Sequence, residues 1–111
     1  MKTFGAREFN QPVLIERKAT SRNVIGEEIV VWVKVCDVPA KANPLRGREF
    51  FAAGGLQQES ITRFVIRYQD GINENMRLTW RGEHYNIGSV IDVDGAMRYI
   101  ELMTTKGVND G

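Results

Sequence analysis

The stretch TRFVIRYQDGINENMRLTWRGEHYNIGSVIDVDGAMRYIELM, residues 62–103, decides the fold of this chain. Short apolar runs alternate in it with three glycine-containing turns, at Asp70-Gly71, Arg81-Gly82 and Asp94-Gly95. This spacing is typical of consecutive antiparallel strands joined by tight turns. We therefore expect strands over residues 62–68, 76–80, 83–87 and 96–103.

The alternation within these runs separates an inner face from an outer one, because successive side chains of a strand point to opposite sides. The expected core residues of the first two strands are Phe64, Ile66, Tyr68, Met76, Leu78 and Trp80. The opposite faces carry four arginines, Arg63, Arg67, Arg77 and Arg81. If the two strands are hairpin partners, these guanidinium groups share one basic surface.

A shared basic surface has two interpretations. It suits a contact with nucleic acid, or it is an ordinary ion-paired surface that needs no ligand. Acidic side chains are close in sequence, at Asp70, Glu74 and Glu83. Ion pairing is the interpretation that we favour.

The first half of the chain predicts two further strands. One begins at Val13-Leu14-Ile15, directly after Pro12. The other covers residues 27–35, where both faces are apolar. A strand of this kind is expected at the centre of the sheet, covered on one side by the core and on the other by a helix, a loop or another subunit.

The connection between residues 37 and 61 is much longer than an ordinary hairpin loop. Its prolines, Pro39 and Pro44, predict an extended and irregular course. Residues 48–53 have the propensity for a short helix, which would end at Gly54-Gly55. Loops of this length are typically functional or disordered, so we expect a role for this segment.

Composition bounds the class of protein. A chain of 111 residues matches one domain, which we assign to residues 1–111, with loose ends at residues 1–10 and 104–111. The 15 basic and 14 acidic side chains nearly cancel, so net charge argues for no particular partner. Cys36, the single cysteine, has no partner for an internal disulfide and is expected to act as a small buried hydrophobe. With no signal peptide or membrane-length apolar run, a reducing cytoplasm is the expected location.

The common signatures of catalysis and metal binding are absent from the sequence. There is no phosphate-binding glycine loop, zinc-ligand spacing or nucleophile elbow. His84 has no assignable partner to orient it. Asp92 and Asp94 resemble the start of a calcium loop, but Met103 stands where the closing glutamate would be. We expect no catalytic residue, no metal and no cofactor.

A set of spaced residues resembles the head-tail joining, or head-closure, proteins of tailed bacteriophages. The set comprises Trp32, Gly47-x-Glu49, Ala52-Ala53, Ile66-Arg67-Tyr68, Ile72, Met76-Arg77-Leu78, Trp80-Arg81-Gly82, Tyr85-Asn86-Ile87, Arg98 and Ile100-Glu101-Leu102. No single element of it is specific. The order and spacing together cover residues 13–103, which makes the combination informative.

The resemblance implies an all-β fold, a small antiparallel β-barrel with one short helix in its long loop. It implies a structural protein without catalytic activity, which forms a ring at the neck between the DNA-filled head and the tail and helps close the head channel. Its partners would be copies of itself, a portal-side adaptor and tail-completion proteins, with genome DNA passing through the channel without sequence-specific binding. Assembly would occur in the host bacterial cytoplasm.

The resemblance also implies a set of contact residues. In similar proteins the long loop projects toward the channel, so contacts to neighbouring subunits or DNA would fall on Pro39, Lys41, Asn43, Pro44, Arg46, Arg48 and Glu49. The free subunit would be a monomer whose loop becomes ordered on docking. Two other classes stay open: a small nucleic-acid-binding β-barrel that uses the four arginines, and, ranked last, a small hydrolase.

Overall fold

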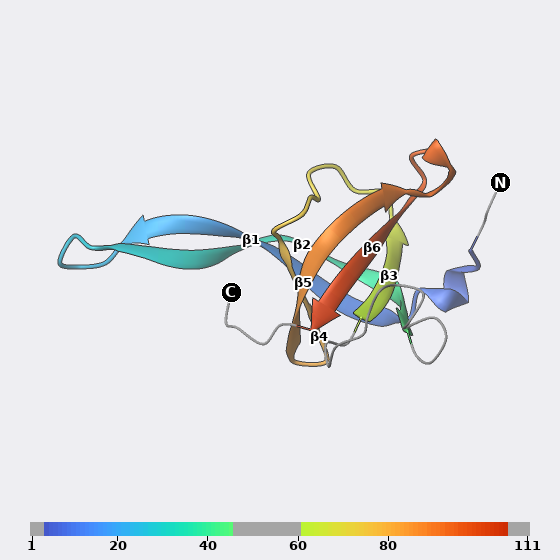
Figure 1. The fold of residues 1–111 in the computed structure, drawn as a ribbon, viewed down its shortest axis with the longest axis horizontal. Coiled ribbons are helices and arrows are strands. Elements are labelled where there is room, and N and C mark those ends of the chain that lie inside the picture. The colour runs from blue at the N-terminus through green and yellow to red at the C-terminus, as the bar shows by residue number, and fades with distance from the viewer. Residues whose placement is uncertain (1–3, 46–60, 107–111) are drawn as a thin grey trace.

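Six strands form a closed barrel in the computed structural model, which describes residues 4–45 and 61–106 (Figure 1). The strands are β1 (Gln11–Arg22), β2 (Glu28–Pro44), β3 (Ile61–Arg67), β4 (Arg77–Trp80), β5 (Glu83–Asp92) and β6 (Tyr99–Lys106). Their order around the barrel is β1-β2-β3-β6-β5-β4, and every neighbouring pair is antiparallel. The predicted all-β barrel is confirmed.

The described residues contain two 3-10 turns, η1 (Ala6–Glu8) and η2 (Val93–Gly95). No helix in this part of the chain is both long enough and apolar enough to cross a membrane. The short helix predicted at residues 48–53 lies outside the described residues.

The core has three aromatic rings at its centre. The ring centroid of Phe64 lies 5.3 Å from that of Trp80 and 5.6 Å from that of Tyr85, both in edge-on contacts. Such arrangements are favourable for aromatic quadrupoles and fill the barrel interior. The predicted core set is confirmed: Phe64, Ile66, Met76, Leu78 and Trp80 are buried, and Tyr68 packs against them.

Two of the predicted turns reverse the chain as expected. Between β4 and β5, Arg81 and Gly82 have φ angles of 53° and 77°, the left-handed values that a two-residue hairpin turn requires. Between β5 and β6, Asp94 and Gly95 have φ angles of 59° and 63°. Both turns join strands that are hydrogen-bonded neighbours.

The predicted hairpin between β3 and β4 is wrong. β3 pairs with β2 and β6, whereas β4 pairs with β1 and β5. The chain between them crosses the barrel and buries Ile72 and Met76 on the way. It is held there by the Ile87 amide, which donates to the Met76 carbonyl at 3.1 Å. The segment that connects β3 to β4 is therefore fixed by burial of its apolar side chains in the core, and no tight turn joins the two strands directly.

β1 and β2 continue beyond the barrel as a two-stranded ribbon, which Figure 1 shows as a long projection. β1 pairs with β4 only from Leu14 to Glu16, next to a register shift at Ile15/Glu16. We call residues 17–33 the arm. The expected central strand at residues 27–35 is therefore wrong in its placement: Ile29 and Val30 are 40% and 56% exposed rather than covered by the core.

The long loop expected from residue 37 begins later than predicted. β2 runs through Pro44, so Asp37 and the seven residues after it are strand rather than loop. Pro12 and Pro39 are opposite each other in the β1–β2 ladder. On the side of β1 that faces away from β2, pairing with β4 begins at Leu14, and on the side of β2 that faces away from β1, pairing with β3 begins at Lys41. Both prolines precede these ladders, so the N–H group that each proline lacks does not interrupt them.

The described ends of the chain are better packed than predicted. Phe4 and Phe9 contact Tyr99, with ring centroids 4.9 and 5.7 Å away. β6 continues to Lys106, past the expected start of the tail at Thr104. The Thr104 hydroxyl is buried and donates to the Thr62 carbonyl at 2.9 Å. The structure thus places aromatic contacts within residues 4–10 and strand pairing at residues 104–106, where the sequence predicted loose ends.

Candidate interaction surfaces

The base of the arm is fixed to the barrel by a charged and aromatic cluster. Arg77 on β4 donates from Nε and Nη2 to Glu16 Oε1 at 3.1 and 2.7 Å. Its guanidinium also lies 4.2 Å from the ring centroid of Trp32 on the arm. Both charged side chains are mostly buried, at 12% and 15% exposed. The direction of the arm is therefore set by side-chain contacts as well as by the strand ladder.

The turn at the tip of the arm is rigidly hydrogen-bonded. The side-chain oxygen of Asn23 accepts from the amides of Ile25 and Glu27, both at 3.0 Å. Arg22 donates to the carbonyl of Gly26 at 2.8 Å. This network places two aliphatic side chains in solvent, with Val24 102% and Ile25 73% exposed.

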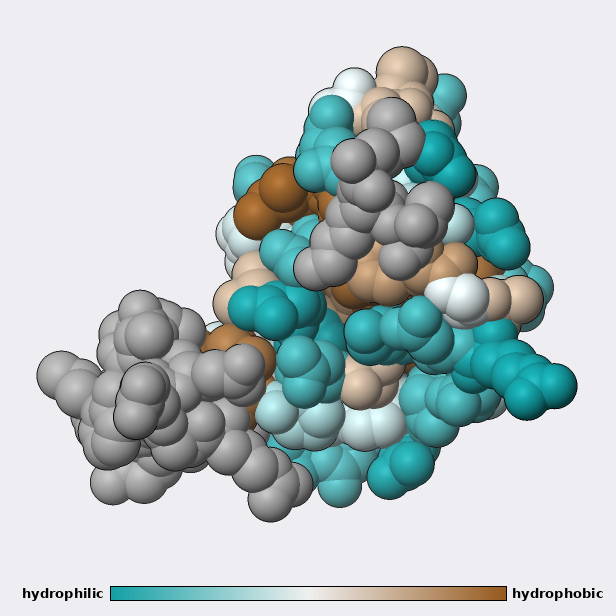
Figure 2. All heavy atoms as spheres, turned by 90° about the vertical axis from the view of Figure 1, so that its right-hand side faces the viewer, coloured by the Kyte–Doolittle hydropathy of each residue, from teal (hydrophilic) through white to brown (hydrophobic). Residues whose placement is uncertain are grey.

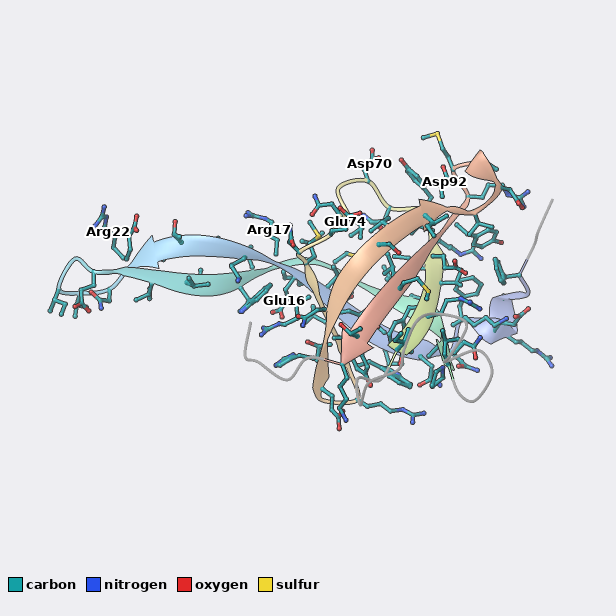
Figure 3. The ribbon with its side chains drawn as sticks, viewed as in Figure 1. Glu16, Arg17, Arg22, Asp70, Glu74 and Asp92 are labelled. Carbon is teal, nitrogen blue, oxygen red and sulfur yellow. The ribbon has the colours of Figure 1, made fainter. Side chains whose placement is uncertain are left out.

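An ordered turn that displays Val24 and Ile25 is a candidate contact surface. Transfer of one such side chain from water into an apolar contact contributes about 1.5–3 kcal/mol. Exposed apolar groups clustered in one place typically mark an interaction site. Figure 3 shows Arg17 and Arg22 projecting from the arm, with Asp70, Glu74 and Asp92 on the barrel. At the tip, the two aliphatic side chains stand beside charged residues of both signs, since Arg22 is opposite Glu28 in the ladder and Glu27 closes the turn.

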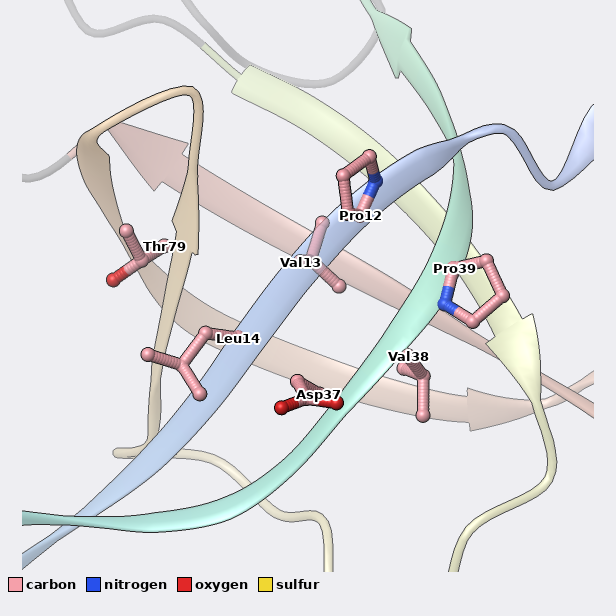
Figure 4. Close-up of a pocket in the computed structure, with 7 residues that line it drawn as sticks. All are labelled: Pro12, Val13, Leu14, Asp37, Val38, Pro39 and Thr79. Carbon is pink, nitrogen blue, oxygen red and sulfur yellow. The ribbon is translucent and has the colours of Figure 1, made fainter.

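A shallow groove of about 530 Å³ lies on the outer face of the barrel, near the base of the arm (Figure 4). Its outward side chains come from three neighbouring strands. Pro12 and Leu14 belong to β1, Pro39 and Asp37 to β2, and Thr79 to β4. Since Asp37 is the one ionisable side chain among the groove residues described, the surface is mainly apolar with an acidic edge.

The contact residues predicted for the long loop separate into two groups. Pro39, Lys41, Asn43 and Pro44 lie on β2, and the last three pair with β3. Lys41 is engaged within the chain, with Nζ 2.8 Å from Glu8 Oε1. Pro39 lines the groove, and Lys41 and Pro44 line a second hollow beside Trp80. The remaining predicted residues, Arg46, Arg48 and Glu49, lie outside the described residues.

The four arginines of the predicted basic face do not form one surface. β3 carries Arg63 and Arg67, and two strands separate it from β4 in either direction around the barrel. Arg63 Nε is 3.2 Å from Glu101 Oε2, and Arg77 pairs with Glu16. Ion pairing thus accounts for these two arginines, with acidic partners different from the predicted ones.

The other two arginines of the set rest on aromatic rings. Arg67 lies 5.8 Å from the ring centroid of Phe9, and Arg81 lies 4.6 Å from that of Trp80. The end of the molecule opposite the arm shows hydrophilic side chains interspersed with hydrophobic ones (Figure 2). Because these four arginines contact aromatic or acidic side chains of the same chain, part of their positive charge is already compensated there.

The residues considered for catalysis or metal binding have structural contacts. His84 Nδ1 lies 2.9 Å from the hydroxyl of Thr79, its cross-strand neighbour. Asp92 accepts from the Met97 amide at 3.0 and 3.2 Å, which fixes the β5–β6 turn. Within residues 4–45 and 61–106, no cluster of acidic, histidine or cysteine side chains is arranged to hold a metal ion. Burial raises the pKa of the half-buried Cys36 thiol, which packs against the core.

The arm and the groove are the features that sequence reasoning missed. A signal for the arm was present: Val24 and Ile25 stand between Asn23 and Gly26, where polar turn residues are usual. The polar run from Glu16 to Arg22 also indicates a strand with no buried face. The groove had no comparable signal, because it forms from three strands whose neighbours are set only by the closed fold.

The described residues form a closed barrel with a projecting arm and a shallow outer groove. Comparison with known proteins gives the class of protein that has this fold. The chain belongs to the phage head completion protein family, whose model matches residues 5–107. Its role is therefore that of a structural protein of a phage particle.

Individual relatives are similar over nearly the whole chain. Head completion protein gp16 of Bacillus phage SPP1 is 27% identical over 105 residues, which is 94% of each protein. Protein SF1141 of Shigella flexneri 2a has the same fold, with a TM-score of 0.74, 22% identity, and coverage of 92% of this chain and 96% of that one. A chain of the native gene transfer agent virion gives a TM-score of 0.60 at 14% identity, covering 89% and 94%.

Proposed function

We propose that this chain joins head to tail in a tailed phage, forming a ring at the neck that helps close the head channel. The observation that carries the proposal is the family match over residues 5–107. The name of the SPP1 relative, a head completion protein, supports it, and so does the fold shared with a chain of a phage-like virion. The proposed role is structural and needs no catalysis.

The proposed partners are copies of this chain, a portal-side adaptor and tail-completion proteins. Subunits would meet in the host bacterial cytoplasm during assembly and stay in the virion neck. The chain would act as one barrel domain, with Pro39, Lys41, Asn43 and Pro44 near neighbouring subunits or the channel. A heterologous contact repeated around an axis closes a ring without requiring a strongly hydrophobic monomer.

Genome DNA would pass through the ring without sequence-specific recognition. The alternative of a nucleic-acid-binding barrel has less support, because its four arginines lie on separate strands and contact acidic or aromatic side chains. A binding groove for single strands needs a continuous basic track with exposed aromatic platforms. Strong salt-dependent DNA binding by the free protein, lost on replacing Arg63 and Arg67, would favour that alternative instead.

The proposal is tested by electron microscopy of particles made when the gene of this chain carries a stop codon in its parent phage. Separate filled heads and complete tails are expected, with joined virions restored when the intact chain is supplied from a plasmid. Normal joined virions without this chain would overturn the proposal. A plasmid copy with the same stop codon is the matched control.

A further inference from the structure

The arm has two free edges. Along residues 17–33 its strands pair only with each other, and no other strand of the described chain lies beside either of them. Pairing with the barrel begins at Glu16 on β1 and at Lys41 on β2. Figure 1 shows the ribbon projecting from the barrel. A free edge carries unpaired backbone N–H and C=O groups, which are a template for pairing with another strand.

The two edges differ in how they are protected. The β1 edge, residues 17–22, carries three basic side chains, Arg17, Lys18 and Arg22, and charges of this kind deter pairing. The β2 edge, residues 28–34, reads Glu-Ile-Val-Val-Trp-Val-Lys, with only β-branched and aromatic residues between its two charges. These residue types have the highest strand propensity. The β2 edge is therefore the one suited to pairing.

The rest of the chain is too short to run along the β2 edge. The Leu45 amide donates to the Ile61 carbonyl at 2.9 Å, so segment 46–60 leaves and returns at one point. If seven of its residues lay along the edge, about four would remain for each connection, a reach of about 14 Å. Lys34, the near end of the edge, is 11 residues from Leu45 along the strand, roughly 36 Å of ladder. The terminal segments 1–3 and 107–111 are shorter than the edge itself.

The charges of the β2 edge are complementary to those of a second copy. When two edges run antiparallel with Val31 opposite Val31, Glu28 of each copy is opposite Lys34 of the other. The two neighbouring registers place Glu28 opposite Trp32 or Cys36 instead. A parallel arrangement in register places like charges side by side. Charge thus selects one orientation and one register.

The ladder within each arm extends this charge pattern. Glu28 is opposite Arg22 in its own copy, and Lys34 is opposite Glu16. The row across the four strands is then Arg22, Glu28, Lys34 of the second copy and Glu16 of the second copy, with alternating signs. The present partner of Lys34 is Asp37, an exposed pair that contributes little and can exchange. Asp37 is not directly opposite an acidic side chain in this register.

The apolar side chains of the edge also match. The register places Ile29 opposite Val33 and Val30 opposite Trp32, and aromatic pairs with β-branched residues are favourable across strands. Ile29 and Val30 are both exposed in the single chain. Pairing therefore covers apolar surface as well as the free backbone groups.

We propose that the free protein forms a two-fold dimer in which the β2 edges, residues 28–34, of two copies pair antiparallel with Val31 on the axis. The four-stranded sheet that results, β1-β2-β2-β1, has the basic β1 edges on its outside. Because both copies use the same surface, the assembly stops at two. The contact is small, so the dimer is weak and forms in concentrated protein, in place of the monomer that the family resemblance implies.

The axis is tested by disulfide formation in a Cys36→Ala background. Val31→Cys places two thiols opposite each other, at the separation of an antiparallel pair, which a disulfide can span. Ala19→Cys is the matched control, because Ala19 is the ladder partner of Val31 and lies on the same face of the arm, at the β1 edge. In concentrated protein with oxidised glutathione, Val31→Cys is expected to give at least tenfold more disulfide-linked dimer than Ala19→Cys.

The register is tested by charge reversal in the otherwise unaltered chain. Glu28→Lys and Lys34→Glu each place like charges opposite each other at two symmetric positions. Each variant alone is expected to dimerise about tenfold more weakly than the unaltered protein in sedimentation velocity. In an equimolar mixture, the two substituted side chains meet each other and the two unsubstituted ones meet each other, both with opposite charge. The mixture is therefore expected to regain dimer that neither variant forms alone.

Three results would overturn the proposal. One is an unaltered protein that stays monomeric at its highest soluble concentration. Another is an Ala19→Cys yield that equals or exceeds that of Val31→Cys, which would indicate pairing of β1 edges or packing of the arms face to face. The third is a mixture of charge variants no more dimeric than its components. None of these results touches the neck function, which the stop-codon phage tests independently.

Discussion

At the scale of single residues, Arg77 has the most consequential position. It joins three elements, because it lies on β4, pairs with Glu16 at the end of the barrel part of β1, and contacts Trp32 on the arm. The sequence placed it on an outward face of its strand, which is correct. Its partners could not be predicted, since Glu16 is distant along the chain and the β1–β4 pairing follows only from barrel closure.

Replacement of Arg77 by methionine is expected to destabilise the fold. The change keeps the apolar stem but leaves Glu16 partly buried without its cation, which costs about 1–3 kcal/mol in the free energy of unfolding. Urea unfolding followed by tryptophan fluorescence measures the loss. Arg17→Met, on an exposed part of the same β1 strand, is the control and should change stability by less than about 0.5 kcal/mol. Equal effects of the two changes would contradict this assignment.

Cys36 is expected to be a slow thiol. Burial raises its pKa, so at a given pH a smaller fraction is thiolate, the form that reacts. The rate of iodoacetamide labelling in the folded protein should rise at a higher pH than in the urea-unfolded chain, which serves as control. By linkage, the stability contribution of the protonated thiol is present below the unfolded-state pKa and lost as pH rises through the folded value. Superimposable pH profiles would rule the effect out.

At the scale of elements, local turn chemistry was predictable and strand neighbours were not. Arg81-Gly82 identified the β4–β5 hairpin, because left-handed residues fit the twist of paired strands. The break at Asp70-Gly71 carries a comparable signal, with Gly71 at a φ of 86°, yet the chain then crosses the barrel. Turn residues show where a strand ends, whereas the next partner depends on which apolar faces meet in the core.

The β4–β5 turn offers a direct test of this reasoning. Gly82→Ala places a Cβ at a φ of 77° and should lower the free energy of unfolding by about 1–2 kcal/mol. Gly88→Ala, in β5 itself, meets only ordinary contact at 3.6 Å from the Met103 carbonyl and should have little effect. Thermal unfolding by circular dichroism compares the two, and a larger loss from Gly88→Ala would refute the explanation.

At the scale of the whole molecule, the barrel and the arm have different physical bases. The barrel buries a common core from all six strands, whereas the arm has cross-strand pairing and exposed aliphatic side chains. The doubly apolar pattern of residues 27–35 was interpreted as a central strand, covered on one face by the core and on the other by a helix, a loop or another subunit, whereas most of this segment lies on the arm and exposes Ile29 and Val30. For residues 27–35 the alternation therefore predicted a strand correctly, whereas it did not predict that this strand extends beyond the barrel.

Shortening the arm should leave the barrel folded. Replacing residues 19–31 by Asn-Gly joins Lys18 directly to a turn before Trp32 and retains the contact of Trp32 with Arg77. The Tm is expected to change by only a few degrees, and the radius of gyration in X-ray scattering to fall below that of the unaltered protein measured alongside it. An unfolded product would show that the arm belongs to the folding core. Joined virions should be lost in the same variant if the arm carries the subunit contact.

The continuity of β1 and β2 from barrel to tip also has a mechanical consequence. A tensile force applied at the tip along the axis of the arm is carried by the backbones of both strands and loads, in shear, the hydrogen bonds that join them to the rest of the barrel. The strands that receive this load end in the closed ladder, where β1 is bonded to β4 and β2 to β3. A load taken up at the tip would thus pass along both strands directly into the wall of the barrel.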